Sequence, residues 1–216
     1  MQQDGSSLSL TGNDEVTDLP SLAVMPGKAK PVDRISYLCK RATRKNVLYI
    51  GSNNNHKLHS KLQELTDKLH RIDNPDSLFH TTDIIQEEKL NYATEAGNWD
   101  IIIVDGVLEH SESPLLLLTA IRERFGSLAC EIIITVPNVM SINVPFSRNN
   151  QSTSGQFYWF SSFSLNRILI KAGYTPLYHD FVTHKPMSSG RFKKLVMKYL
   201  VRKPAFRQTL IYTAKF

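Results

Sequence analysis

The chain has 216 residues, a formal net charge of +6 and two cysteines. This length suffices for one domain with a buried core and an additional tail. Cys39 and Cys130 are too few for a disulfide framework and lack metal-ligand spacing. No apolar run approaches the roughly 18 residues of a membrane span, and the N-terminus has no basic segment followed by an apolar core. We therefore expect a cytoplasmic protein that is neither exported nor anchored.

The first 30 residues are rich in Ser, Gly, Asp, Gln and Pro and lack hydrophobic periodicity, so 1–30 is expected to be a disordered tail and 31–216 the folded domain. Within that domain the apolar residues alternate between helical and strand periods. The pattern predicts helices over 31–41, 57–69, 114–125 and 164–172, and strands over 46–50, 70–73, 78–82, 99–105, 131–136, 174–183 and 209–216. This alternation is typical of a doubly wound α/β sheet.

The strand at 46–50 leads into Gly51 and small polar residues, and an amphipathic helix follows. A strand, a tight turn and a helix N-terminus can together bind part of a nucleotide-like ligand, and glycine permits the backbone angles of such a turn. Asp73 lies 22 positions beyond Gly51, near the roughly 20-residue spacing at which an acidic side chain binds a ribose hydroxyl. Only one of the usual three glycines is present, so a turn without a ligand is the alternative.

Several short segments follow one another in an order that carries a family resemblance. They are VLYIG at 47–51, WD at 99–100, VLEH at 107–110, VPN at 136–138, WFS at 159–161 with Leu165, and AGY at 172–174. The set resembles the class I S-adenosylmethionine-dependent methyltransferases, in particular the small-molecule branch with a VLEH segment after the fourth strand. The resemblance covers roughly 33–216. It implies a Rossmann-like, mostly parallel sheet of seven strands with helices on both faces and an antiparallel last strand.

The resemblance also implies cofactor contacts at the carboxyl ends of the strands, where open α/β sheets bind their ligands. These are Gly51 and Ser52 against the methionine part of S-adenosylmethionine, Asp73 on the ribose hydroxyls, Asp83 and Ile84 beside the adenine, and Asp105 facing the cofactor cleft.

The chain departs from the family pattern at three places. Asn residues at 53–55 stand where the glycine-rich turn usually has small residues, although Asn tolerates left-handed backbone angles. Some related quinone-pathway enzymes bind a metal through two glutamates and a histidine, but Gly106 occupies the first glutamate's place, so we expect no metal. Gln156 replaces a histidine that many relatives carry before the WFS triplet. His110 is therefore the candidate polar group near the reacting centre, and a purely structural role for it is the alternative.

The segment 185–207 carries eight basic residues and no acidic one, with apolar residues at helical spacing. It reads as a basic helical insertion packed on the sheet. The alternative is a lid or surface that attracts an anionic substrate or, at most peripherally, an acidic membrane. We expect no nucleic-acid partner, because the charge comes without a recognisable binding motif.

The sequence thus predicts methyl transfer from S-adenosylmethionine to oxygen or nitrogen of a small molecule, with a saccharide or a lipid-linked precursor as candidates. The main alternative is a non-catalytic protein of the same fold that serves as a binding or scaffolding partner. A third hypothesis is a basic module that associates with RNA or peripherally with a membrane, and it depends on the C-terminal charge alone.

Overall fold

The structure is a computed structural model that describes residues 33–51, 56–73, 91–95, 97–141, 157–182 and 207–216. The expected tail over 1–30, the strand over 78–82 and the basic insertion over 185–207, apart from Arg207, lie outside these residues. Among the residues that it describes, no helix has both the length and the apolar character needed to cross a bilayer.

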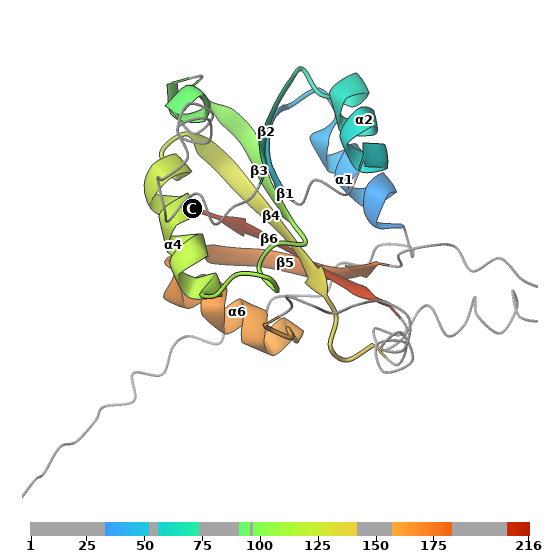
Figure 1. The fold of residues 1–216 in the computed structure, drawn as a ribbon, viewed down its shortest axis with the longest axis vertical. Coiled ribbons are helices and arrows are strands. Elements are labelled where there is room, and N and C mark those ends of the chain that lie inside the picture. Colours follow the sequence, from blue (N-terminus) through green and yellow to red (C-terminus); the bar gives the residue numbers. More distant parts are fainter. Residues whose placement is uncertain (1–32, 52–55, 74–90, 96, 142–156, 183–206) are drawn as a thin grey trace, which may run out of the picture.

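Six strands form one sheet in the order β2-β1-β3-β4-β6-β5 (Figure 1). The strands are β1 (Asn46–Gly51), β2 (Lys68–Asp73), β3 (Trp99–Asp105), β4 (Ala129–Pro137), β5 (Thr175–Val182) and β6 (Thr209–Lys215). β1 to β4 are parallel, whereas β6 runs antiparallel to both β4 and β5. The antiparallel last strand is as expected. Seven strands were expected and six are described; the segment 78–82 lies outside the described residues.

Four helices of nine or more residues flank the sheet: α1 (Arg34–Ala42), α2 (His56–Leu65), α4 (Pro114–Phe125) and α6 (Ser162–Lys171). Capping side chains set where α1, α4 and α6 begin. The Asp33 carboxylate accepts a hydrogen bond from the Ser36 N–H, and Ser113 caps α4 in the same way with Pro114 at its start. Ser161 and Ser164 form a reciprocal capping box at α6.

The helices lie on both faces of the sheet, with α1 and α2 on one face and α4 and α6 on the other (Figure 1). Strand residues alternate between the two cores, because successive side chains of a strand point to opposite faces. On β3, for example, Ile102 and Val104 join the α4/α6 core, whereas Ile101 and Ile103 join the α1/α2 core. This packing buries most of the central strand residues, and polar residues gather at the carboxyl ends of these strands.

One helix boundary was predicted wrongly. The helix expected over 57–69 ends at Leu65, and β2 already begins at Lys68. The chain turns because the Asp67 N–H donates to the Lys45 carbonyl and the Arg44 N–H donates to the Leu65 carbonyl, which aligns β2 beside β1. Leu69 continues the helical spacing only in sequence, since it is a strand residue paired with Val47 and packs on the α1/α2 core.

Candidate functional site

The carboxyl ends of three neighbouring parallel strands bring three of the predicted site residues into one row. Gly51 at the end of β1 is in register with Asp73 at the end of β2 and with Asp105 at the end of β3. Asp105 is in turn opposite Thr135 on β4. Ser52, Asp83 and Ile84 lie outside the described residues, and for Asp73 the structure describes the backbone position only. The described part of the candidate site is therefore this row and the segment that follows β3.

Asp105 is the most heavily bonded carboxylate of this edge. Its side chain is buried and accepts hydrogen bonds from the Tyr49 hydroxyl on Oδ2 at 2.9 Å and from the Thr135 hydroxyl on Oδ1. Arg34 of α1 reaches the same carboxylate, with Nη1 3.0 Å from Oδ1. The residues of this polar cluster thus come from α1, β1, β3 and β4, and they compensate the Asp105 charge within the protein.

Tyr49 belongs to the apolar run of β1 in the sequence, but its hydroxyl makes it part of the polar cluster. Burial, followed by the neighbouring Asp105 charge, raises the pKa of the Tyr49 phenol. The phenol therefore stays protonated and acts as a hydrogen-bond donor over the working pH range.

Gly51 is required for a different reason than the one expected. Its φ does not lie in the left-handed region, so the turn-forming freedom of glycine is not in use there. A Cβ at this position would come within 2.5 Å of the Tyr49 ring. Because the Tyr49 hydroxyl is bound to Asp105, the ring cannot readily move aside. Gly51 therefore makes room for Tyr49 and, through it, for the polar cluster.

The segment after β3 turns sharply at Gly106, whose φ is +65°. The Gly106 N–H donates to the Thr135 carbonyl at 3.1 Å, and the His110 N–H closes the turn on the Val107 carbonyl at 3.0 Å. A glutamate at position 106 would have to adopt this left-handed angle, which non-glycine residues rarely do. The backbone thus accounts for the glycine at this point of the VLEH segment.

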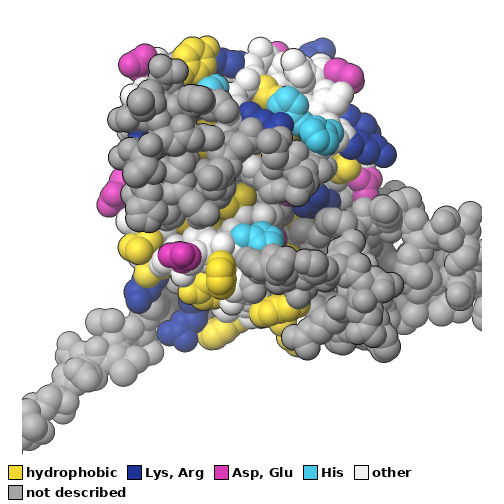
Figure 2. Space-filling view, in the orientation of Figure 1, with side chains coloured by type: hydrophobic (Ala, Val, Ile, Leu, Met, Phe, Trp, Pro, Cys, Tyr) yellow, Lys and Arg dark blue, Asp and Glu magenta, His cyan; other side chains and the backbone are white. Residues whose placement is uncertain are grey.

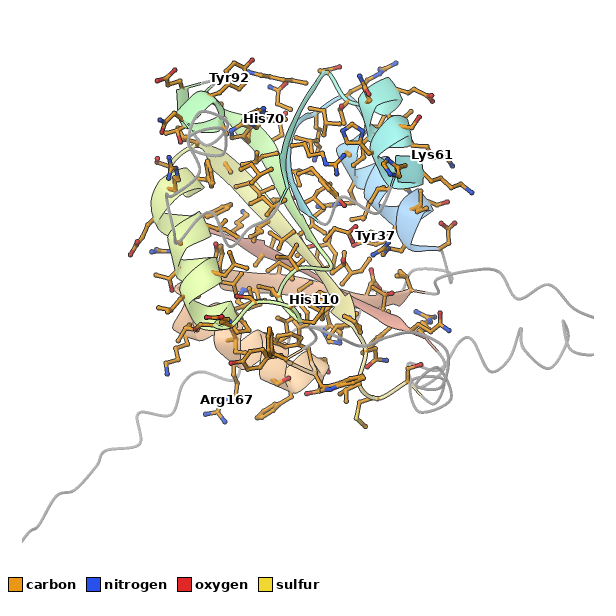
Figure 3. All side chains as sticks on the ribbon, in the orientation of Figure 1. Tyr37, Lys61, His70, Tyr92, His110 and Arg167 are labelled. Atoms are coloured by element: carbon orange, nitrogen blue, oxygen red, sulfur yellow. The ribbon has the colours of Figure 1, made fainter. Side chains whose placement is uncertain are left out.

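Glu109 and His110 sit side by side in this turn but in opposite environments. His110 is exposed, and its position is labelled in Figure 3. Glu109 is only 4% exposed, and its Oε2 atom has no hydrogen-bond partner among the residues that the structure describes. Burial raises the pKa of the Glu109 carboxyl to about 7. The sequence analysis selected His110 and passed over Glu109, because burial of one residue in a turn leaves no periodic signal.

An aromatic segment lies against this turn. The N–H groups of Phe157 and Tyr158 both donate to the Glu109 carbonyl, at 2.8 and 3.2 Å. Phe160 is buried, whereas Trp159 is partly exposed. Exposed apolar side chains are also found just after the end of β4 and on α6, and Figure 2 shows hydrophobic side chains on the face in view. The most exposed are Met140, Phe157 and Phe163.

Among the described residues, no group of three or more His, Cys, Asp or Glu side chains could hold a metal ion. The polar groups of the edge can instead bind hydrogen-bond donors and positive charge, through Glu109, or contact an apolar ligand through the neighbouring aromatic segment.

No protein-family model matches the chain, and no curated protein matches it. Several solved structures do match the chain in fold. The small RNA methyltransferase HEN1 superposes with a TM-score of 0.54 at 17% identity, over 84% of this chain and 24% of HEN1. A protein described as a methyltransferase, in complex with the Haloferax volcanii Trm112 methyltransferase activator, gives a TM-score of 0.54 at 10% identity over 83% of this chain and 87% of that one.

The chain has a methyltransferase fold. At these identities the likeness establishes the architecture alone, and this chain spans only about a quarter of HEN1. The expected Rossmann-like α/β class is thereby confirmed, whereas the small-molecule branch indicated by the VLEH segment stays a prediction. The methyltransferase fold places the row formed by Gly51, Asp73 and Asp105 at the edge where open α/β sheets bind their ligands.

Proposed function

We propose that the protein transfers a methyl group from S-adenosylmethionine to a small-molecule acceptor. The observation that carries the proposal is the alignment of Gly51, Asp73 and Asp105 at the ends of adjacent parallel strands, within a fold shared with methyltransferases. The stretch at 78–82 is proposed as the seventh strand of a doubly wound sheet.

The residues at the edge fit such a cofactor in two respects. Asp73 ends the strand next to Gly51, which is where a carboxylate can accept hydrogen bonds from ribose hydroxyls. Glu109 offers an unpartnered carboxyl oxygen at the same edge. Ser52 is proposed on the methionine part together with Gly51, and Asp83 and Ile84 beside the adenine.

The role proposed for Asp105 is altered by its contacts. Since Arg34, Tyr49 and Thr135 already bind its carboxylate, Asp105 shapes the wall of the cleft by holding these side chains in place. A direct bond from Asp105 to the ligand is not needed for this role.

The cofactor supplies a methyl group on a sulfonium, and the task of the protein is to hold the acceptor oxygen or nitrogen in line with it. His110 is proposed as the polar group beside the reacting centre, because it is exposed in the turn after β3. The exposed aromatic segment next to this turn suits an acceptor with an apolar part, which is consistent with a lipid-linked precursor. A saccharide would use the hydrogen-bonding groups of the edge instead.

The test is calorimetric titration of the purified protein with S-adenosylmethionine and with its demethylated product, S-adenosylhomocysteine. Micromolar binding supports the proposal and justifies a screen of acceptors. Absence of binding at millimolar ligand, from a sample shown to be folded by circular dichroism, would refute it and favour the non-catalytic alternative.

A further inference from the structure

A buried carboxyl oxygen without a partner is unusual, because buried polar groups in folded proteins are nearly always hydrogen-bonded. Glu109 is such a case: its side chain is 4% exposed and Oε2 has no partner. Leaving a buried acceptor unsatisfied destabilises the folded protein, and more so when the acceptor is charged. A position that carries this cost in the unliganded protein is a candidate for a group that is completed by a ligand.

The location of Glu109 links it to the proposed site. It lies four residues after Asp105, and its Oε1 is 3.7 Å from the point at which a Cβ on Gly106 would lie. The carboxyl is thus turned back towards the end of β3. Its own backbone carbonyl is held by the N–H groups of Phe157 and Tyr158. Glu109 therefore stands between the carboxyl edge of the sheet and the exposed aromatic segment.

Burial outweighs the groups that stabilise the ionised Glu109 carboxyl, which include its own backbone N–H. Arg34 of α1, Asp105 of β3 and His110 of the same turn are the charged or titratable groups that act on it. Arg34 forms its ion pair with Asp105, so that these two charges offset each other. Burial is the largest influence and raises the pKa of Glu109 to about 7. A large fraction of Glu109 is consequently protonated at neutral pH, and a positive charge brought to the edge would favour its ionised form.

We propose that Glu109 is the counter-charge for a cationic ligand bound at the carboxyl edge of the sheet, namely the sulfonium of the cofactor. This inference rests on the proposed function. When the cation binds, Glu109 loses its proton to solvent and pairs with the positive charge. The demethylated product carries a neutral sulfur, so it lacks the charge that Glu109 matches and leaves more readily.

The experiment is titration calorimetry at pH 7 in EDTA-treated buffers with different ionisation enthalpies, which reports the protons exchanged on binding. S-adenosylmethionine and S-adenosylhomocysteine are the probes, and native protein is compared with Glu109→Gln. Subtracting the proton release of the variant from that of the native protein removes the contribution of protons gained or lost by the ligands themselves. Native protein should release about half a proton more than the variant with S-adenosylmethionine, since a group with a pKa of about 7 is half protonated at this pH. The extra release with S-adenosylhomocysteine should be smaller.

Glu109→Gln should also weaken S-adenosylmethionine binding about tenfold, which corresponds to a shift of one unit in the pKa of Glu109 on binding. It should change S-adenosylhomocysteine binding less. Glu112→Gln is the matched control, because Glu112 is an exposed glutamate of the same segment. Glu109→Asp keeps a titratable carboxyl and should retain proton release, which covers the case in which the glutamine variant folds poorly.

Equal proton release for the two ligands, or release that Glu109→Gln leaves unchanged, would overturn the inference while the proposed function stands. If the folded native protein binds neither ligand, the proposed function falls, and the inference falls with it.

Discussion

Replacing Glu109 with glutamine should make the protein more stable at alkaline pH. Glutamine has nearly the same shape but no charge, so it removes the cost of ionising a buried carboxyl. In the folded protein the pKa of Glu109 is raised from its ordinary value of 4.5 to about 7 by burial. The folded state therefore favours the protonated form, and the native protein loses stability as the pH rises from about 4.5 through about 7.

The size of the effect follows from this difference. Each unit of pKa difference is worth about 1.36 kcal/mol. The rise in the pKa of Glu109 from 4.5 to about 7 therefore corresponds to a loss of about 3 kcal/mol in the free energy of unfolding. Below pH 4.5 the carboxyl is protonated in both states and the loss is absent. Glu109→Gln should therefore be close to native stability at pH 4.5 and more stable by up to about 3 kcal/mol at pH 8.

The assay is urea unfolding, followed by circular dichroism, of native protein, Glu109→Gln and the exposed-site control Glu112→Gln between pH 4.5 and 8. The free energies of unfolding of native protein and Glu109→Gln should diverge as the pH rises, whereas that of the control should follow the native value. Parallel curves for native protein and Glu109→Gln would show that Glu109 is ionised at little cost, and would refute the reasoning from its burial.

Three further substitutions test the edge. Asp73→Ala should weaken S-adenosylmethionine binding by about 1.5–3 kcal/mol in calorimetry, the range for a hydrogen bond to a charged group; unchanged affinity would refute its ribose role. Arg34→Met should lower the free energy of urea unfolding by about 3 kcal/mol, because it removes one side of the ion pair with the buried Asp105 carboxylate; near-native stability would contradict this. Gly51→Ala should cost about 1–3 kcal/mol through overpacking against the Tyr49 ring. That cost should largely disappear in a Tyr49→Ala background, and an equal cost in both backgrounds would exclude the Tyr49 contact as its cause.

The regular elements could be predicted from the sequence because their signals are local. The strand over Trp99–Asp105 and the helix over Pro114–Phe125 match the predicted bounds, since the first is a continuous apolar run between acidic residues and the second starts at a Ser-Pro pair. The 57–69 helix was predicted too long because Leu69 keeps the helical spacing across the boundary with β2. Only the pairing of β2 with β1 shows that Leu69 belongs to a strand.

The polar cluster could not be predicted, because it is built from positions that are distant in sequence and individually unremarkable. Arg34 and Asp105 are 71 residues apart, and Tyr49 and Asp105 are 56 apart. Tyr49 looks like one more apolar residue of a strand, and Arg34 like one more surface charge of a helix. Gly51 and Asp105 could be assigned to the ends of their strands, but the sequence gave no indication that Tyr49 fills the space beside Gly51.

The carboxyls of Asp105 and Glu109 differ in what surrounds them, and this difference determines how experiments on them should be interpreted. Asp105 has hydrogen bonds or an ion pair from three side chains, so Asp105→Asn would disturb several elements at once. Loss of ligand binding in that variant would not identify Asp105 as a ligand contact. Glu109 has a carboxyl oxygen with no partner, so Glu109→Gln removes a charge while breaking no described hydrogen bond of that oxygen. A change in ligand binding in Glu109→Gln, together with unimpaired stability, would therefore report directly on the site.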